Sequence, residues 1–120
     1  MGIARYFIAL CAVSQPAIAD VGGDYNCYGV APGWSLSVME RTAIFTNPDP
    51  LAMDVMQDDF AQGSSKTRAM TLLGGQQTAV VVIKNGFCRI GHEAFSVGVT
   101  VLTQHEDTAH ILEGCCAPKN

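Results

Sequence analysis

The stretch "EGCCAPKN", residues 113–120, contains two adjacent cysteines, Cys115 and Cys116. Such a doublet can close on itself, bind a metal as thiolates, or form disulfides with two different cysteines elsewhere in the chain. Neighbouring α-carbons lie about 3.8 Å apart, whereas the α-carbons of a disulfide are usually about 4.4–6.8 Å apart. A bond within the doublet is therefore disfavoured, and the choice between the other two roles depends on the compartment.

The first residues have the features of a secretory signal peptide. Arg5 precedes an apolar run over residues 6–13, and residues 17–19 have the small-x-small pattern of a cleavage site. The run is much shorter than the roughly 20 residues that a membrane-spanning helix needs. We therefore expect residues 1–19 to be a signal peptide and residues 20–120 to be one exported domain, periplasmic or secreted, without stable insertion into a membrane.

Export changes the cysteine count. Of the five cysteines, Cys11 leaves with the signal peptide, so four remain. The residue before Cys11 is a leucine, which is too large for a lipid-attachment site, so a lipid anchor is not expected. An even number of cysteines in an oxidising compartment indicates disulfides. Cys27 and Cys88 are each expected to pair with one member of the doublet Cys115-Cys116, and the assignment stays open.

Composition indicates one small acidic domain. The chain has 7 Lys and Arg residues against 11 Asp and Glu residues, and the loss of Arg5 with the signal peptide moves the formal net charge from −4 to −5. An acidic domain without a basic cluster is a poor candidate for binding nucleic acid or anionic lipid. About a hundred residues bury only a modest core, so disulfides would add much of the stability.

Most of the mature chain shows the patterns of β-strands. "WSLSVM", residues 34–39, alternates apolar residues with serine. "TAVVVIK", residues 78–84, is a continuous β-branched run, typical of a strand buried on both faces, and it precedes the turn dipeptide Asn85-Gly86. "FSVGVTVL", residues 95–102, alternates again, with Gly98 as a candidate bend.

Shorter patterns predict further strands over residues 42–45, 66–73 and 110–114. Residues 46–66 contain prolines and glycine and are expected to be a loose segment. A helical turn within it is possible over residues 51–60, where Met53, Met56 and Phe60 have helical spacing. The resulting prediction is an all-β fold, a small antiparallel barrel or sandwich of about seven short strands, stapled by disulfides.

Three landmarks carry a resemblance: "CYGVAPGWSLSV", "NGFCRIG" and "LEGCC". They are similar to small bacterial envelope proteins of unknown function, often described as uncharacterised membrane proteins or putative lipoproteins, with Cys-x-Gly-x-x-Pro-x-Trp near the start and a C-terminal Gly-Cys-Cys. That set in turn loosely resembles META-type domains and inhibitors of c-type lysozyme. The chain departs from it at Gly33, where relatives carry phenylalanine, and at residues 89–93, where they carry an Asp-Gly-Met-Ser-Asp-like turn. The Ser-Gly and Thr-Lys-Gly elements associated with the lysozyme inhibitors are not recognisable either, so lysozyme inhibition is a weak analogy and is not carried over.

Two histidines form the strongest candidate for a metal site. His105 and His110 bracket "EDTA", a predicted hairpin tip, where two imidazoles beside a carboxylate could bind Zn²⁺ or Cu²⁺. A solvated polar hairpin is the favoured interpretation, so no metal and no cofactor is predicted. A thiol-redox centre would need a Cys-x-x-Cys pair or an activated thiol, and the sequence contains no Cys-x-x-Cys.

The sequence contains no motif for catalysis, and we predict a non-catalytic exported domain rather than an enzyme. Its partner would be an envelope protein or a small ligand, including an apolar molecule if the barrel is open. Binding residues are expected where conformationally special residues and exposed polar groups meet in connecting segments. The candidates are Pro32, Trp34, Gly91, His92 and Glu93, although Trp34 also fits a core position beside a disulfide. The alternative is a metal-handling or thiol-redox protein that uses the cysteine doublet with His105 and His110.

Overall fold

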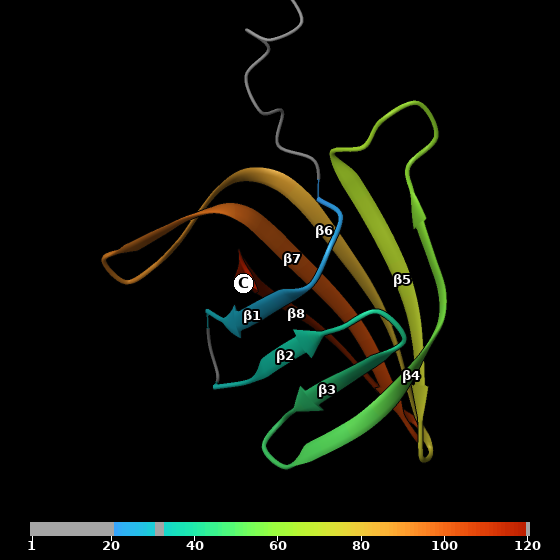
Figure 1. Ribbon diagram of the computed structural model, residues 1–120. Helices are drawn as coiled ribbons and strands as arrows, with labels where there is room; N and C mark the ends of the chain where they lie inside the picture. Colours follow the sequence, from blue (N-terminus) through green and yellow to red (C-terminus); the bar gives the residue numbers. More distant parts are fainter. Residues whose placement is uncertain (1–20, 31–32, 120) are drawn as a thin grey trace, which may run out of the picture.

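The computed structural model describes residues 21–30 and 33–119, so the predicted signal peptide and Pro32 lie outside the described residues. The described chain forms a closed barrel of eight antiparallel strands (Figure 1). The strands are β1 (Tyr25–Gly29), β2 (Ser35–Val38), β3 (Thr42–Thr46), β4 (Pro50–Phe60), β5 (Thr67–Gly74), β6 (Gln77–Ile90), β7 (Glu93–His105) and β8 (Thr108–Pro118). Each pairs with the next, and β8 closes on β1. The all-β prediction is confirmed, with eight strands where about seven were expected.

Two observed strands, β1 and β4, had no counterpart among the strand ranges that we expected, and β4 lies in the segment that we expected to be loose or partly helical. Met53 is buried inside the barrel while Met56 is exposed, so these two residues do not share the helical face that their spacing indicated. The strand pairs with both β3 and β5 and contains a bulge between Val55 and Gln57. Hydrogen bonding to two neighbouring strands outweighs a weak local pattern, because strand preference depends strongly on tertiary context.

The expectation that β6 is buried on both faces is wrong. Ala79, Val81 and Ile83 point into the core, whereas Val80 is exposed and Val82 is half-buried. A single-layer barrel leaves most of its outer face uncovered, so this continuous β-branched run is fully buried on one side only.

The predicted turn at Asn85-Gly86 is also wrong. The strand β6 continues to Ile90, and its register with β7 shifts between Asn85 and Cys88, where two residues of β6 lie opposite one residue of β7. Such a bulge bends the strand and increases its twist. The bend that we expected at Gly98 therefore occurs in the neighbouring strand.

The interior of the barrel is filled by side chains. The largest fully buried ones are Phe45, Leu36, Met53, Met70, Leu72 and Ile83, and they belong to one hydrophobic cluster. An eight-stranded barrel has an interior just wide enough for its side chains to fill. The interior is consequently a packed core, which removes the reason to expect an apolar ligand inside an open barrel.

Arg68 connects the segment before β1 to the barrel. Its Nη1 donates hydrogen bonds to the carbonyl oxygens of Val21 (3.0 Å) and Gly23 (2.7 Å), and Val21 N–H donates to Ser65 O (3.2 Å). Its Nε and Nη2 donate to the two carboxylate oxygens of Asp58 at 2.7 and 2.8 Å. The hydrogen bonds to Asp58 raise the pKa of Arg68, so the guanidinium remains charged although the residue is buried.

Candidate functional site

The cysteine doublet lies on β8, and its two side chains point to opposite faces of the barrel wall. Cys116 faces the core and forms a disulfide with Cys27 of β1, across 89 residues of sequence. Cys115 faces outward and forms a disulfide with Cys88 of β6, across 27 residues. Successive side chains of a strand alternate between faces, which explains why adjacent cysteines reach different partners. The two expected disulfides are confirmed, and the structure assigns their pairing.

The outer disulfide anchors a hairpin that we call the arm, residues 86–96. Pairing of β6 with β5 ends at Lys84, and pairing of β7 with β8 ends at Val97, so the arm extends beyond the barrel as a ribbon of two strands (Figure 1). The Cys88 sulfur lies 3.2 Å from the carbonyl oxygen of Gly114. The ring centroid of Phe95 lies 6.2 Å from that of Tyr28 on β1. These contacts hold the arm against the outer face of the barrel.

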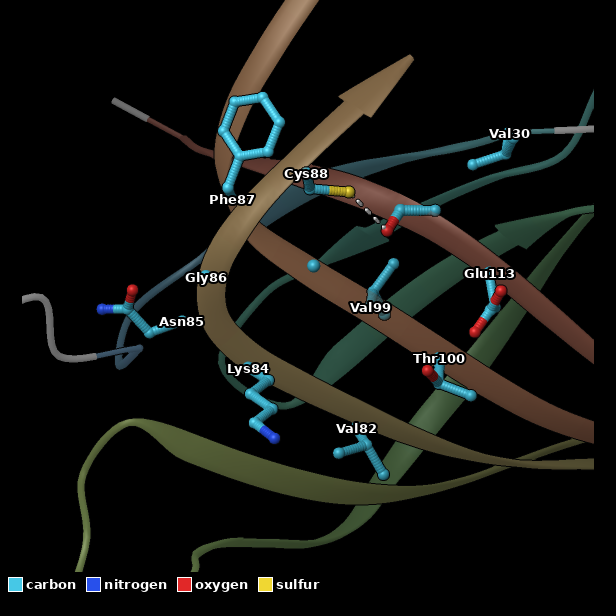
Figure 2. Close-up of a pocket in the computed structure, with 12 residues that line it drawn as sticks. Val30, Val82, Lys84, Asn85, Gly86, Phe87, Cys88, Val99, Thr100 and Glu113 are labelled. Atoms are coloured by element: carbon cyan, nitrogen blue, oxygen red, sulfur yellow. Dashed lines mark hydrogen bonds between the residues drawn. The ribbon is translucent and has the colours of Figure 1, made fainter.

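A pocket of about 440 Å³ lies between the arm and the barrel wall. Its lining is Val30, Val82, Lys84, Asn85, Gly86, Phe87, Cys88, Gly98, Val99, Thr100, Glu113 and Gly114. Most of the wall comes from outward positions of β6, β7 and β8, and the arm contributes Gly86, Phe87 and Cys88 (Figure 2). Phe87 is the most exposed large hydrophobic side chain among the described residues, at 76%. The pocket therefore combines an apolar lining with an exposed aromatic ring at its edge.

Two opposite charges lie on either side of this pocket. Figure 2 shows Lys84 on β6 and Glu113 on β8, with β7 between them. Both side chains are exposed. Among residues 21–30 and 33–119 the ion pair is between Arg68 and Asp58, so neither Lys84 nor Glu113 has an ionic partner there. Both charges are available to a ligand.

Gly98 forms part of the pocket wall, and the fold does not require a glycine at this position. A Cβ there would lie 3.8 Å from the Cys88 sulfur and 3.9 Å from the Gly114 carbonyl oxygen, which are ordinary contact distances. Position 98 points outward, because its neighbours Val97 and Val99 are buried in the core. A side chain at this position would enter the pocket, so the glycine keeps the pocket open.

Gly114 is the contrasting case. A Cβ at this position would overlap the carbonyl oxygen of Tyr28 and lie 3.1 Å from Cζ2 of Trp34. The close approach of β8 to β1 and the packing of the Trp34 indole both need the missing side chain. Gly114 therefore serves the fold, whereas Gly98 leaves space for a ligand.

We predict that Gly98→Ala keeps or slightly raises the free energy of unfolding, because glycine weakens a strand and alanine fits here. Gly114→Ala is expected to lower it by about 2 kcal/mol or more, because the overlap is with backbone. Urea denaturation of both variants at equal protein concentration measures the difference. Equal losses in the two variants would mean that Gly98 has a structural role after all.

The predicted binding residues that the structure describes do not line the pocket beneath the arm. Trp34 is 3% exposed and packs against Gly29 and Gly114, so it is a core residue. Gly91, His92 and Glu93 lie at the exposed tip of the arm, outside the set that lines the pocket. Their role in binding stays a prediction. The pocket residues were missed because their outward orientation depends on strand register, and the local signal among them was Gly98 inside a strand pattern.

His105 and His110 flank the turn between β7 and β8, as predicted. Thr103 pairs with His110 and His105 pairs with Thr108, so the two histidines are diagonal neighbours on one face. They line a second pocket of about 310 Å³ together with Asn47, Gln77, Thr103, Glu106 and Thr108. Within the described residues, no group of three or more His, Cys, Asp or Glu residues could hold a metal ion. The four cysteines that the structure describes offer no thiolates, because all of them are in disulfides.

No known protein family, curated protein or solved structure matches the chain. In the part of the chain that the structure describes, no helix is long and apolar enough to cross a membrane. The pocket beneath the arm is therefore interpreted from its own geometry.

Proposed function

We propose that the mature chain is a non-catalytic exported domain of the bacterial envelope that binds a protein or small ligand in the pocket beneath the arm. The observation that carries the proposal is the anchored arm, which the Cys88–Cys115 disulfide holds over a pocket of about 440 Å³. Disulfides form and persist in oxidising compartments, and this supports export to the periplasm or the exterior. The resemblance to small envelope proteins agrees with that location.

The chemistry of the pocket favours binding over catalysis. Its ionisable side chains are Lys84 and Glu113. Lys84 and Glu113 lie two strands apart, and Glu113 comes two residues before the residue of β8 that is level with Lys84. This places their α-carbons about 12 Å apart. A nucleophile and its base must be within hydrogen-bond reach, so these two groups do not form such a pair. The exposed ring of Phe87 instead provides the large, rigid contact area that is typical of binding sites.

Site-specific photocrosslinking tests this proposal. The residue p-benzoylphenylalanine replaces Phe87 in the full chain, exported by the bacterium that encodes it, and the same residue at the exposed Met56 of β4 is the control. We expect a discrete adduct from position 87 that is absent from position 56. Adding Gly98→Val, which fills the pocket, should abolish the adduct. No adduct at 87, identical adducts at both positions, or an adduct that persists with Gly98→Val would contradict the proposal.

A further inference from the structure

The pocket continues into an exposed aliphatic surface on the barrel wall. Val80, Leu102 and Ile111 are direct cross-strand partners on β6, β7 and β8, and we call them the aliphatic row. Their exposed fractions are 40%, 48% and 69%. The row follows directly after Val82, Thr100 and Glu113, which form the adjacent outward row and line the pocket. Pocket and row therefore form one continuous strip.

The strip runs along β7. Its outward positions are Gly98, Thr100 and Leu102, spaced by about 6.8 Å, so the strip extends for about 14 Å. An extended peptide repeats its side chains with the same spacing on one face. The strip thus matches an extended segment of about five or six residues, and it is longer than the pocket alone.

The strip also carries a positive side chain on one side and a negative side chain on the other. Lys84 lies on the β6 side and Glu113 on the β8 side, and the aliphatic row follows beyond them. Neither charge has an ionic partner among residues 21–30 and 33–119. An occupant with an acidic group towards Lys84 and a basic group towards Glu113 would satisfy both, and such complementarity provides specificity at an interface. One cation paired with one anion is not the basic patch that nucleic acids or anionic lipids require.

Side chains, and not a free strand edge, must hold the occupant on this strip. In the barrel, β7 is hydrogen-bonded to β6 on one side and to β8 on the other over the positions that form the strip. Addition of a strand needs an exposed edge, which the strip does not provide. Apolar contacts on the row and two charge pairs are the remaining sources of affinity.

We infer that the occupant is an extended segment of a partner protein, with aliphatic side chains on the row and the pocket, an acidic residue facing Lys84 and a basic residue facing Glu113. This inference rests on the proposed function and names the class of partner. A small molecule would occupy the pocket and leave the row exposed, whereas an extended segment covers both.

A charge-exchange experiment tests the inference. The probe is a phage-displayed library of random linear dodecapeptides, selected against the full mature domain with both disulfides formed. The same selection is made against the double variant Lys84→Glu/Glu113→Lys, which keeps the net charge. The control is Arg41→Glu/Asp54→Lys, which exchanges two exposed charges on the other side of the barrel. Circular dichroism and urea denaturation establish that all three proteins are folded.

We expect the unmodified domain and the control to enrich peptides in which aliphatic residues are accompanied by an acid and a base in one order. The Lys84/Glu113 exchange should enrich the reverse order. A synthetic peptide from the first selection should bind the exchanged variant about tenfold more weakly, because both charge contacts become repulsive.

Three outcomes would overturn the inference. The first is enrichment of the same peptides by all three proteins. The second is no enrichment by the unmodified domain. If the photoreactive residue at position 87 still gives an adduct of small-molecule mass that Gly98→Val abolishes, the proposed function stands while the peptide inference fails. The third is crosslinking of position 87 to a second copy of the chain. If sedimentation also shows self-association, and the Lys84→Glu/Glu113→Lys exchange alters it, the partner is a second copy.

Discussion

Replacing Cys27 and Cys116 together by alanine is expected to lower the free energy of unfolding by about 5 kcal/mol. This disulfide joins β1 to β8, the two strands that close the barrel. In the chain-entropy account, a cross-link over 89 residues stabilises by about 4.6 kcal/mol. Both sulfurs are buried in the core, so the variant also loses packing. We expect marginal stability and loss of the native β signal at modest urea concentration.

The Cys88→Ala/Cys115→Ala variant is the matched comparison. Its loop of 27 residues corresponds to about 3.6 kcal/mol, and the disulfide lies on the outer face, where it anchors only the arm. We expect the barrel to stay folded at low urea and the arm to become accessible to protease near Arg89, with loss of the Phe87 crosslink. Urea denaturation under non-reducing conditions, followed by circular dichroism and limited trypsin digestion, separates the two effects. If the barrel unfolded at the same urea concentration in both variants, it would be wrong that Cys27–Cys116 stabilises the barrel while Cys88–Cys115 anchors only the arm.

Replacing Asp58 by alanine is expected to lower the free energy of unfolding by about 2 kcal/mol. Arg68 is buried, and its fork of hydrogen bonds to Asp58 would lose both acceptors while the guanidinium keeps its charge. Breaking a buried ion pair from one side costs about 3–5 kcal/mol. The Asp58 side chain is 29% exposed, and solvent screening reduces the cost.

Two further variants distinguish this ion pair from a general effect of charge removal. Asp59→Ala removes the neighbouring exposed carboxylate and is expected to change the free energy of unfolding by less than about 0.5 kcal/mol. Arg68→Met combined with Asp58→Leu should recover much of the loss, because apolar replacement of both partners leaves no buried charge. Urea denaturation of the single and double variants measures the coupling. An Asp58→Ala loss no larger than that of Asp59→Ala would show that the pair is unimportant.

Local sequence patterns predicted several strands well. The alternation in residues 34–39 and 95–102 reflects one buried and one exposed face, and β2 and β7 have that arrangement. The strand predicted over residues 66–73 is β5. In contrast, β1, β4 and the continuation of β6 past Gly86 were not predicted. Their formation depends on hydrogen bonds to neighbouring strands and on a bulge, which leave little trace in local composition.

Asp58 illustrates the same limit for side chains. In the sequence it lies in an acidic, proline-containing segment and resembles a solvated carboxylate. In the barrel it accepts two hydrogen bonds from Arg68, ten residues further along the chain on the neighbouring strand β5. The antiparallel register of β4 and β5 brings the two side chains together, and that register shifts at the bulge between Val55 and Gln57.

The cysteine doublet shows which properties of the protein follow from the local sequence and which depend on the tertiary structure. Adjacency disfavours a bond between Cys115 and Cys116, although the Cys27–Cys116 disulfide itself joins α-carbons only 3.9 Å apart. With Cys11 assigned to the predicted signal peptide, the four remaining cysteines indicate two disulfides with earlier partners. Which partner each cysteine takes depends on the face to which it points, and therefore on how β8 is placed between β1 and β7. The pocket depends on the same placement, because Cys115 faces outward and Cys88 meets it over Gly98 of β7 on the outer face. Residues distant in sequence, such as Lys84 and Glu113, line one pocket only after the barrel closes and its register is set.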